Sequence, residues 1–400
     1  MDSKTNPSLS ELELESRRVL VRINTDVPVT DNEVTDPSRI RASLATINYL
    51  VENGARVILM GHRGNPAGNF DPSLSLEPVA VHLAAMSRIG EIYLTDSCVG
   101  DGARSVIQGL REGQICLLEN LGFHVGEMKN DDRLARQLAS FCDIYVNESF
   151  SLSEMRLAST CAITRHARLK TTGLQFASET TALRRMVAAT EKPFVFLLGG
   201  DVIDDQMTLL DTFFDRIDSL IIGGSIATTF EAARGGDPGR SRYEKNRLPL
   251  ARDILERAAR RNMKVILPTD VTVRSSDAGV AVMSPGRIPA DATILDAGPQ
   301  TIAGYRPIIG KAGAILWSGR FGTGEGPDHM DSSTAIARAI AGSSAFSLAI
   351  GQGVVDTIRT LGLEKGFDMV CTGETAAMRM LEGKTLPALA ALGFTAGKNR

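Results

Sequence analysis

The chain has 400 residues, of which 43% are apolar and 23% are charged, and its formal net charge is −3. This length exceeds that of one ordinary domain, so two domains with a sizeable core are the natural expectation. Because the net charge is small and no region is strongly basic, partners such as nucleic acids or anionic membranes are not expected.

The cysteine pattern and the N-terminal residues predict a cytoplasmic location. Five cysteines are spread singly, without a C-x-x-C pair, and a chain of this size needs no disulfides. Residues Asp2 to Ser10 are polar and lack the apolar segment of a signal peptide. No apolar run approaches the ~18 residues of a membrane span. The five histidines show no metal-ligand spacing, so no metal site is predicted.

Short apolar runs rich in β-branched residues alternate with helical patterns such as Arg39–Glu52, Asp131–Ala139 and Leu248–Arg260. Continuous apolar strands are typical of parallel sheets covered on both faces, and their alternation with helices indicates βαβ units. The predicted strands are Val19–Ile23, Val57–Met60, Ile92–Leu94, Ile115–Leu118, Ile144–Val146, Phe194–Leu198, Leu220–Ile222, Val265–Leu267, Ile294–Leu295, Ile315–Trp317, Phe346–Ile350 and Met369–Cys371.

The alternation pauses at Ser178–Thr190, which is predicted to be one helix between two halves. We therefore expect an α/β fold of two doubly wound, Rossmann-like parallel sheets. Their predicted limits are residues 1–177 and 191–385, with the joining helix over residues 178–190. In sheets of this kind, ligands bind at the carboxyl ends of the strands.

A dozen sequence blocks, in order from about residue 17 to residue 393, resemble those of phosphoglycerate kinase. They include VLVRINTDVPV, LLENLGFHVGEMKND, DIYVNESF, FVFLLGGD, LIIGGSIATTF, LDAGPQTI, ILWSG and LEGKTLPALAAL. The resemblance implies phosphoryl transfer between ATP and the carboxylate of a phosphorylated hydroxy acid. It also implies an acid-binding N-terminal domain, a C-terminal domain that binds Mg-nucleotide, hinge closure, and a tail over residues 386–400 that returns to the N-terminal domain. The family is typically monomeric.

On the acid side, Arg39 stands where the family has its key catalytic arginine, and His62 stands at the family's cleft histidine. Glu154 and Arg156 are candidates for new cleft residues, and Arg156 could either bind a different anion or pair internally. The family's other basic residues are replaced here by Asn65, Gly122, Glu154, Met155 and Leu157, and its Asp-Phe-Asn reads Asn24-Thr25-Asp26. Both retained residues also have plain structural readings, Arg39 as a surface arginine at a helix start and His62 as a hydrogen-bonded histidine at a strand end.

On the nucleotide side, the candidate cofactor-binding residues are Gly223, Gly224, Glu325, Gly351 and Gly353. Glu325 stands at the family's ribose-binding glutamate, whereas the glycines can serve packing as readily as a ligand. Replacements are Val202 and Gln206 for two lysines, Val354 and Val355 for an Asp–Thr pair, Glu374 and Thr375 for two glycines, and Arg320 for a proline. Asp201, Asp204 and Asp205 could form a metal or acid cluster, but capping of a helix that begins near Asp205 is favoured.

These replacements lead to a functional expectation. A charge-assisted hydrogen bond to phosphate contributes about 1.5–3 kcal/mol, so the loss of three arginines would cost on the order of 5–9 kcal/mol. We therefore expect that transfer of phosphate from ATP to 3-phosphoglycerate is lost, that no cofactor is needed, and that MgATP binds weakly or not at all. A binding or scaffold role toward an unknown small anionic ligand or protein partner is then favoured. The alternatives are an enzyme re-purposed for another carboxylate or acyl phosphate, and a residual phosphoglycerate kinase.

Overall fold

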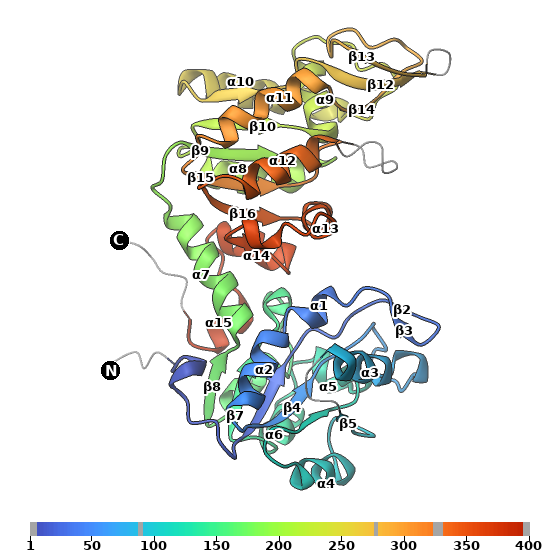
Figure 1. The fold of residues 1–400 in the computed structure, drawn as a ribbon, viewed down its shortest axis with the longest axis vertical. Coiled ribbons are helices and arrows are strands. Elements are labelled where there is room, and N and C mark those ends of the chain that lie inside the picture. Colours follow the sequence, from blue (N-terminus) through green and yellow to red (C-terminus); the bar gives the residue numbers. More distant parts are fainter. Residues whose placement is uncertain (1–5, 87–90, 276–278, 323–330, 395–400) are drawn as a thin grey trace. The chain divides into compact units, whose positions relative to one another are not determined.

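The computed structural model describes residues 6–86, 91–275, 279–322 and 331–394 (Figure 1). The chain divides into two compact units. Unit 1 comprises Met1–Thr181 together with Gly383–Arg400, and unit 2 comprises Ala182–Glu382. Among the described residues, no helix is both long and apolar enough to cross a membrane.

Unit 1 is built on a six-stranded sheet in which every neighbouring pair of strands is parallel. The strand order is β5-β6-β4-β1-β7-β8. The central strand β1 has the sequence RVLVR, and four of its five residues are buried, as expected for a strand covered on both faces. The strands are β1 (Arg18–Arg22), β4 (Arg56–Met60), β5 (Ile92–Leu94), β6 (Ile115–Leu117), β7 (Ile144–Asn147) and β8 (Leu169–Thr172).

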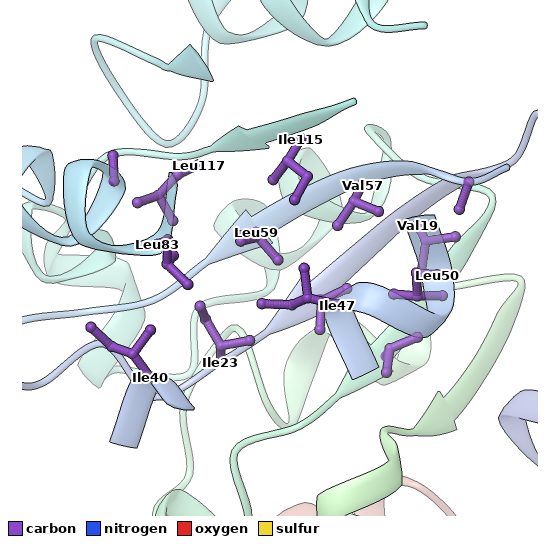
Figure 2. Close-up of a cluster of buried hydrophobic side chains, with 14 of the residues drawn as sticks. Val19, Ile23, Ile40, Ile47, Leu50, Val57, Leu59, Leu83, Ile115 and Leu117 are labelled. Carbon is purple, nitrogen blue, oxygen red and sulfur yellow. The ribbon is translucent and has the colours of Figure 1, made fainter. Parts of the chain in front are cut away.

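One face of this sheet packs against helices through a buried apolar cluster, shown in Figure 2. Helix α2 buries Ile47 and Leu50, which are three residues apart and therefore share one face of the helix. These side chains pack with Val19 and Val57 of the sheet. The helices of unit 1 are α1 (Ser38–Arg41), α2 (Leu44–Glu52), α3 (Glu77–Met86), α4 (Asp101–Gly109), α5 (Val125–Met128), α6 (Asp132–Ala139) and α15 (Pro387–Ala391), with a hairpin of β2 (Val29–Thr30) and β3 (Glu33–Val34).

Unit 2 has a second parallel six-stranded sheet, in the order β11-β10-β9-β15-β16-β17. Its core includes the fully buried Trp317. The strands are β9 (Phe194–Leu198), β10 (Ser219–Ile222), β11 (Lys264–Ile266), β15 (Ala314–Ser318), β16 (Phe346–Ile350) and β17 (Met369–Val370). The helices are α8 (Asp204–Phe213), α9 (Gly224–Ala233), α10 (Leu248–Arg260), α11 (Pro299–Ile309), α12 (Asp331–Ala341), α13 (Gln352–Thr360) and α14 (Glu374–Leu381). The prediction of two doubly wound parallel sheets is confirmed.

A third, antiparallel sheet in unit 2 was not predicted. It has the order β13-β12-β14, with β12 (Val271–Ser275), β13 (Gly279–Met283) and β14 (Thr293–Ala297). Residues Ile294–Leu295, expected to lie in a parallel sheet, belong to β14. Burial alternates along the start of β12, which is typical of a sheet with one solvated face.

Helix α7 (Leu174–Ala188) begins four residues before the predicted Ser178 and ends two residues before the predicted Thr190. The carboxylate of Glu148 accepts hydrogen bonds from the N–H groups of Gln175 and Phe176, at 3.1 and 3.0 Å. Since the first N–H groups of a helix lack intrahelical acceptors, this carboxylate stabilises the earlier start. The sequence pattern did not indicate that Glu148, which directly follows β7, would bind the start of this helix.

Candidate functional site

In unit 1 the direction of strand addition reverses at β1, which lies between β4 and β7. Ligands of open parallel sheets bind at the carboxyl ends of the strands beside such a reversal. Asp26 follows β1, His62 follows β4, and Arg39 lies on α1. Together with Arg22 at the end of β1, these residues form two polar pairs, Arg22 with His62 and Asp26 with Arg39, which we call the unit 1 site.

Asp26 binds Arg39 in the unit 1 site. Nη1 of Arg39 donates to the main-chain oxygen of Asp26 at 2.6 Å and lies 3.3 Å from its Oδ2. The side chains of Arg39 and Asp26 are 45% and 42% exposed. Oδ1 of Asp26 accepts the N–H of Gly64 at 2.9 Å. Asp26 therefore connects α1 with the loop after β4 and supplies a counter-charge for Arg39.

His62 is held by a buried arginine. Its Nδ1 lies 2.7 Å from Nη2 of Arg22, whose side chain is fully buried. A guanidinium group has no acceptor, so Nδ1 must accept this hydrogen bond and the neutral ring carries its proton on Nε2. Burial, reinforced by the charge of Arg22, lowers the pKa of His62 to about 4. His62 is therefore neutral at pH 7 and can donate from Nε2.

The charge of Arg22 is balanced inside unit 1 by Glu127. An oxygen of Glu127 lies 4.0 Å from Nη2 of Arg22, and both side chains are buried. The main-chain N–H and the hydroxyl of Ser159 donate to Glu127, at 3.0 and 2.5 Å. Burial lowers the pKa of Arg22 and raises that of Glu127, while their mutual attraction opposes both shifts. The resulting network fixes Arg22, and through it the ring of His62.

The two other predicted residues of this half lie in the loop that follows Phe150–Leu152. Glu154 is half-buried and Arg156 is exposed. Neither takes part in the hydrogen bonds just described. Their assignment as new cleft residues stays a prediction.

Gly122, which stands where the family has an arginine, is tightly enclosed. A Cβ atom at this position would lie 2.9 Å from Cγ of Pro66 and 3.0 Å from Oδ1 of Asn120. The N–H of Gly122 donates to the same Oδ1 atom, at 2.9 Å. Pro66 and Asn120 therefore fill the space that a larger side chain at position 122 would need.

In unit 2 a cavity of about 120 Å³ lies beside the N-terminal end of α9. Its walls combine apolar side chains, among them Ile294, Leu295 and Phe321, with the charged side chains of Asp201, Glu231 and Arg242. Gly223 and Gly224 border the same cavity. Apolar walls with a few polar groups are typical of sites that hold a ring system and its polar substituents.

Close packing requires glycine at both positions of this turn. A Cβ atom on Gly223 would lie 2.3 Å from the ring of Phe321. Gly224 has φ +63°, and a Cβ atom there would lie 2.6 Å from the main-chain oxygen of Gly200. The turn thus places the first N–H groups of α9 at the cavity, where they can bind an anion.

The predicted capping role of Asp201, Asp204 and Asp205 is wrong, because Asp204 and Asp205 are the first two residues of α8 and lie inside the helix. The N-cap residue is Ile203, which has no side-chain cap; its N–H donates to Glu244 at 2.7 Å. Asp201 instead accepts the hydroxyl of Ser225 at 2.8 Å and pairs with Nη1 of Arg242 at 3.1 Å. Within the described ranges, no group of His, Cys, Asp or Glu side chains is arranged to hold a metal ion.

The two positions that the family fills with lysines have different surroundings. Val202 is half-buried, whereas Gln206 is buried and its Oε1 accepts the hydroxyl of Ser318 at 2.7 Å. Ser318 is the last residue of β15. Gln206 therefore forms a buried hydrogen bond at the end of β15 and is not an exposed side chain.

Helix α13 presents a second glycine-bordered N-terminus. Its N-cap is Gly351, with φ +104°, and Gly353 faces the side chain of Arg320, whose Cβ would lie 3.3 Å from an added Cβ. The carboxylate of Glu374 accepts the N–H of Gln352 at 3.3 Å, a long hydrogen bond. A carboxylate at this end of a helix marks a place that favours negative charge. The remaining predicted residue, Glu325, lies outside the described residues.

Sequence reasoning missed three residues that the structure brings to these sites: Arg22, Asp26 and Arg242. A charge within the apolar run VLVRI was a usable signal for Arg22, because a charged residue in a buried strand needs a partner. Asp26 was noted only as part of a replaced family motif, and Arg242 gave no signal, since the partners of both are identified by the fold alone.

Comparison with known proteins gives one consistent answer. The family model described as phosphoglycerate kinase matches residues 9–384. The phosphoglycerate kinase of Moorella thermoacetica is 36% identical over 389 residues, covering 96% of this chain and 98% of the relative. That of Koribacter versatilis is 37% identical over 396 residues, with the same coverage. The structure of the Coxiella burnetii phosphoglycerate kinase aligns with a TM-score of 0.84 at 33% identity, over 97% of this chain and 98% of that chain.

These relatives correct two expectations of the sequence analysis. The first was that phosphotransfer is lost and that a binding or scaffold role has replaced it. The second was that the protein needs no nucleotide cofactor. Both predictions are wrong, because relatives that match nearly the whole chain are phosphoglycerate kinases, and nothing in the comparison marks a loss of activity. The error was to treat each replaced side chain as lost binding energy. Glycine-bordered helix N-termini can bind phosphate through main-chain N–H groups, and α9 and α13 both have such an end, with Glu374 accepting the N–H of Gln352 at α13.

Proposed function

Because the chain belongs to the phosphoglycerate kinase family, we propose that it transfers a phosphoryl group between MgATP and the carboxylate of 3-phosphoglycerate. The observation that carries this proposal is the family match over residues 9–384. Under this proposal, the small anionic ligand whose identity the sequence did not reveal is 3-phosphoglycerate.

The unit 1 site offers hydrogen-bond donors that suit an anionic acid. Arg39 offers a guanidinium group that is partly exposed, and the neutral ring of His62 offers an Nε2–H donor. Phosphoryl transfer depends mainly on positioning and on stabilisation of negative charge, and both groups supply these without a proton transfer of their own. We assign Arg39 and His62 to the binding and orientation of the acid.

The unit 2 cavity suits a nucleotide. Its apolar walls fit a base, while Gly223, Gly224 and the first N–H groups of α9 suit phosphate. Magnesium would enter with the nucleotide, since phosphate oxygens supply much of its coordination. In place of lysines at positions 202 and 206, the cavity has the guanidinium group of Arg242.

The proposal is tested by measuring ADP formation from ATP and 3-phosphoglycerate, with and without magnesium, using the purified full-length chain. The matched control is Arg39→Ala, which leaves the unit 2 cavity intact and removes the acid-binding charge. We expect turnover that requires magnesium and both substrates, and that falls at least tenfold in the variant. Equal rates for the wild type, the variant and a mock preparation would overturn the proposal.

A further inference from the structure

A carboxylate lies directly beside the guanidinium group of Arg39. Nη1 of Arg39 lies 3.3 Å from Oδ2 of Asp26, within the range of an ion pair. Both side chains are more than 40% exposed, so solvent and ligands can reach the pair. A negatively charged ligand that binds Arg39 therefore meets a carboxylate beside the same guanidinium group.

The three oxygen atoms of Asp26 have separate roles. The main-chain oxygen accepts Nη1 of Arg39, and Oδ1 accepts the N–H of Gly64. Both are ordinary hydrogen-bond acceptors that need no negative charge. The contact of Oδ2 with Arg39 is the one that depends on charge. An amide at position 26 would keep the first two interactions and remove the third.

From this division we propose that Asp26 is a counter-ion that lowers the affinity of the unit 1 site for its anionic substrate by neutralising Arg39. The inference rests on the proposed function, since it takes 3-phosphoglycerate as the ligand. It does not depend on a movement of Arg39, because the main-chain oxygen of Asp26 holds Nη1 at 2.6 Å whether or not the side chain is charged.

The neighbouring groups do not cancel this effect. His62 is neutral at pH 7, because burial and Arg22 lower its pKa to about 4. The charge of Arg22 is balanced by Glu127 in the interior. Arg39 and Asp26 therefore carry the opposed exposed charges of this cluster, and the loss of one leaves the other uncompensated.

The experiment compares Asp26→Asn with Asp31→Asn in the full-length protein. Asp31 is exposed in the turn between β2 and β3, with φ +50°, a conformation that asparagine tolerates well. Each substitution raises the net charge by one unit, but only the first removes the partner of Arg39. We expect Asp26→Asn to lower KM for 3-phosphoglycerate about fivefold, which corresponds to about 1 kcal/mol, the upper end for an exposed ion pair. Asp31→Asn should leave KM unchanged.

Two further measurements distinguish an electrostatic role of Asp26 from a structural one. The decrease in KM caused by Asp26→Asn should become smaller as the salt concentration is raised from about 20 to about 300 mM, because exposed charges are screened. Asp26→Ala also removes the acceptor of Gly64, so its melting temperature should fall below that of Asp26→Asn. A purely structural role for Asp26 would give no salt-dependent gain in either variant.

The outcomes distinguish the inference from the proposed function. If the wild type turns over and Asp26→Asn has the same or a higher KM, the inference is overturned and the proposed function stands. If the wild type is inactive but calorimetry shows that Asp26→Asn binds 3-phosphoglycerate more tightly, the inference stands and the proposed function fails. If neither protein binds 3-phosphoglycerate, both are overturned.

Discussion

Nη2 of Arg22 lies 2.7 Å from Nδ1 of His62, and an oxygen of Glu127 lies 4.0 Å from the same guanidinium nitrogen. A buried acid, a buried base and a partly exposed imidazole thus form one line of contacts from the interior of unit 1 to its proposed site. The protonation and orientation of His62 are consequently decided by groups that a ligand cannot reach.

Removal of Arg22 should destabilise unit 1 strongly. Arg22→Met leaves the buried carboxylate of Glu127 without its counter-ion, and breaking a buried pair costs about 3–5 kcal/mol. The double variant Arg22→Met/Glu127→Gln removes both charges and should recover part of this loss. The measurement is urea unfolding followed by circular dichroism. Equal stabilities of the single and double variants would show that the Arg22–Glu127 ion pair does not contribute to the stability of the protein.

His62 should make the protein less stable in mild acid. Its pKa in the folded protein, about 4, is below the ordinary value of 6.5, so between these limits the unfolded chain binds more protons. The stability that neutral His62 contributes is complete above pH 6.5 and is lost progressively as the pH falls toward 4. His62→Gln keeps an acceptor for Arg22 but does not titrate.

The measurement for His62 is the difference in melting temperature between wild type and His62→Gln from pH 7.5 to 4. A difference is needed because Glu148 titrates in the opposite sense. Burial raises the pKa of Glu148 to about 7, so its contribution to stability is complete below pH 4.5 and is lost as the pH rises through 7. A wild type that loses no more stability than His62→Gln on acidification would contradict the prediction.

Gly122→Ala should destabilise the protein by about 1–3 kcal/mol, because the new methyl group would lie within 3.0 Å of Pro66 and Asn120 in a closed loop. Gly109→Ala is the matched control. Gly109 is in the last turn of α4, and an added Cβ meets nothing within 4 Å. That change should stabilise the protein by about 0.4–1 kcal/mol through the unfolded state. Thermal unfolding of both variants gives the comparison, and the same sign for both would refute the packing argument.

Arg242→Ala should weaken nucleotide binding. The Arg242 side chain borders the unit 2 cavity beside Gly223 and Gly224. It pairs with Asp201 but is 67% exposed, so a phosphate group can reach it. We expect an increase in Kd for MgATP of roughly fivefold, typical of one partly exposed charge. Arg240→Ala removes an exposed arginine two residues away that does not line the cavity. Calorimetric titration that shows equal Kd values for the two variants would exclude Arg242 as a phosphate contact.

The two parallel sheets were predictable because their strands can be recognised from the local sequence alone. Phe194–Leu198 and Phe346–Ile350 are continuous apolar runs, and both strands have the predicted limits. The antiparallel sheet was missed because Val271–Ser275 mixes apolar and polar residues, a pattern shared with loops and exposed strands. Its strands are identified by their pairing in the fold and not by a distinctive run.

The candidate site was less predictable, because its contacts join distant parts of the chain. The sequence indicated Arg39 and His62, but not that Asp26, 13 residues before Arg39, is its counter-ion. Nor could it show that the Arg22 contacting His62 has its own counter-ion at Glu127. Counting the residues missing from a family pattern led to the wrong conclusion about activity, since the count omitted main-chain donors and charges placed at new positions.

Unit 1 is discontinuous in the chain, because Gly383–Arg400 belongs to it while residues 182–382 form unit 2. The N–H of Ala388 donates to the main-chain oxygen of Ser153 at 3.0 Å, and Nζ of Lys170 donates to that of Ala391 at 3.4 Å. During synthesis, these contacts form only after residues 388–391 have been made. Unit 2, a single uninterrupted stretch, can therefore complete its structure before unit 1, and a fragment that ends at Glu382 should show a protease-resistant unit 2 beside an incomplete unit 1.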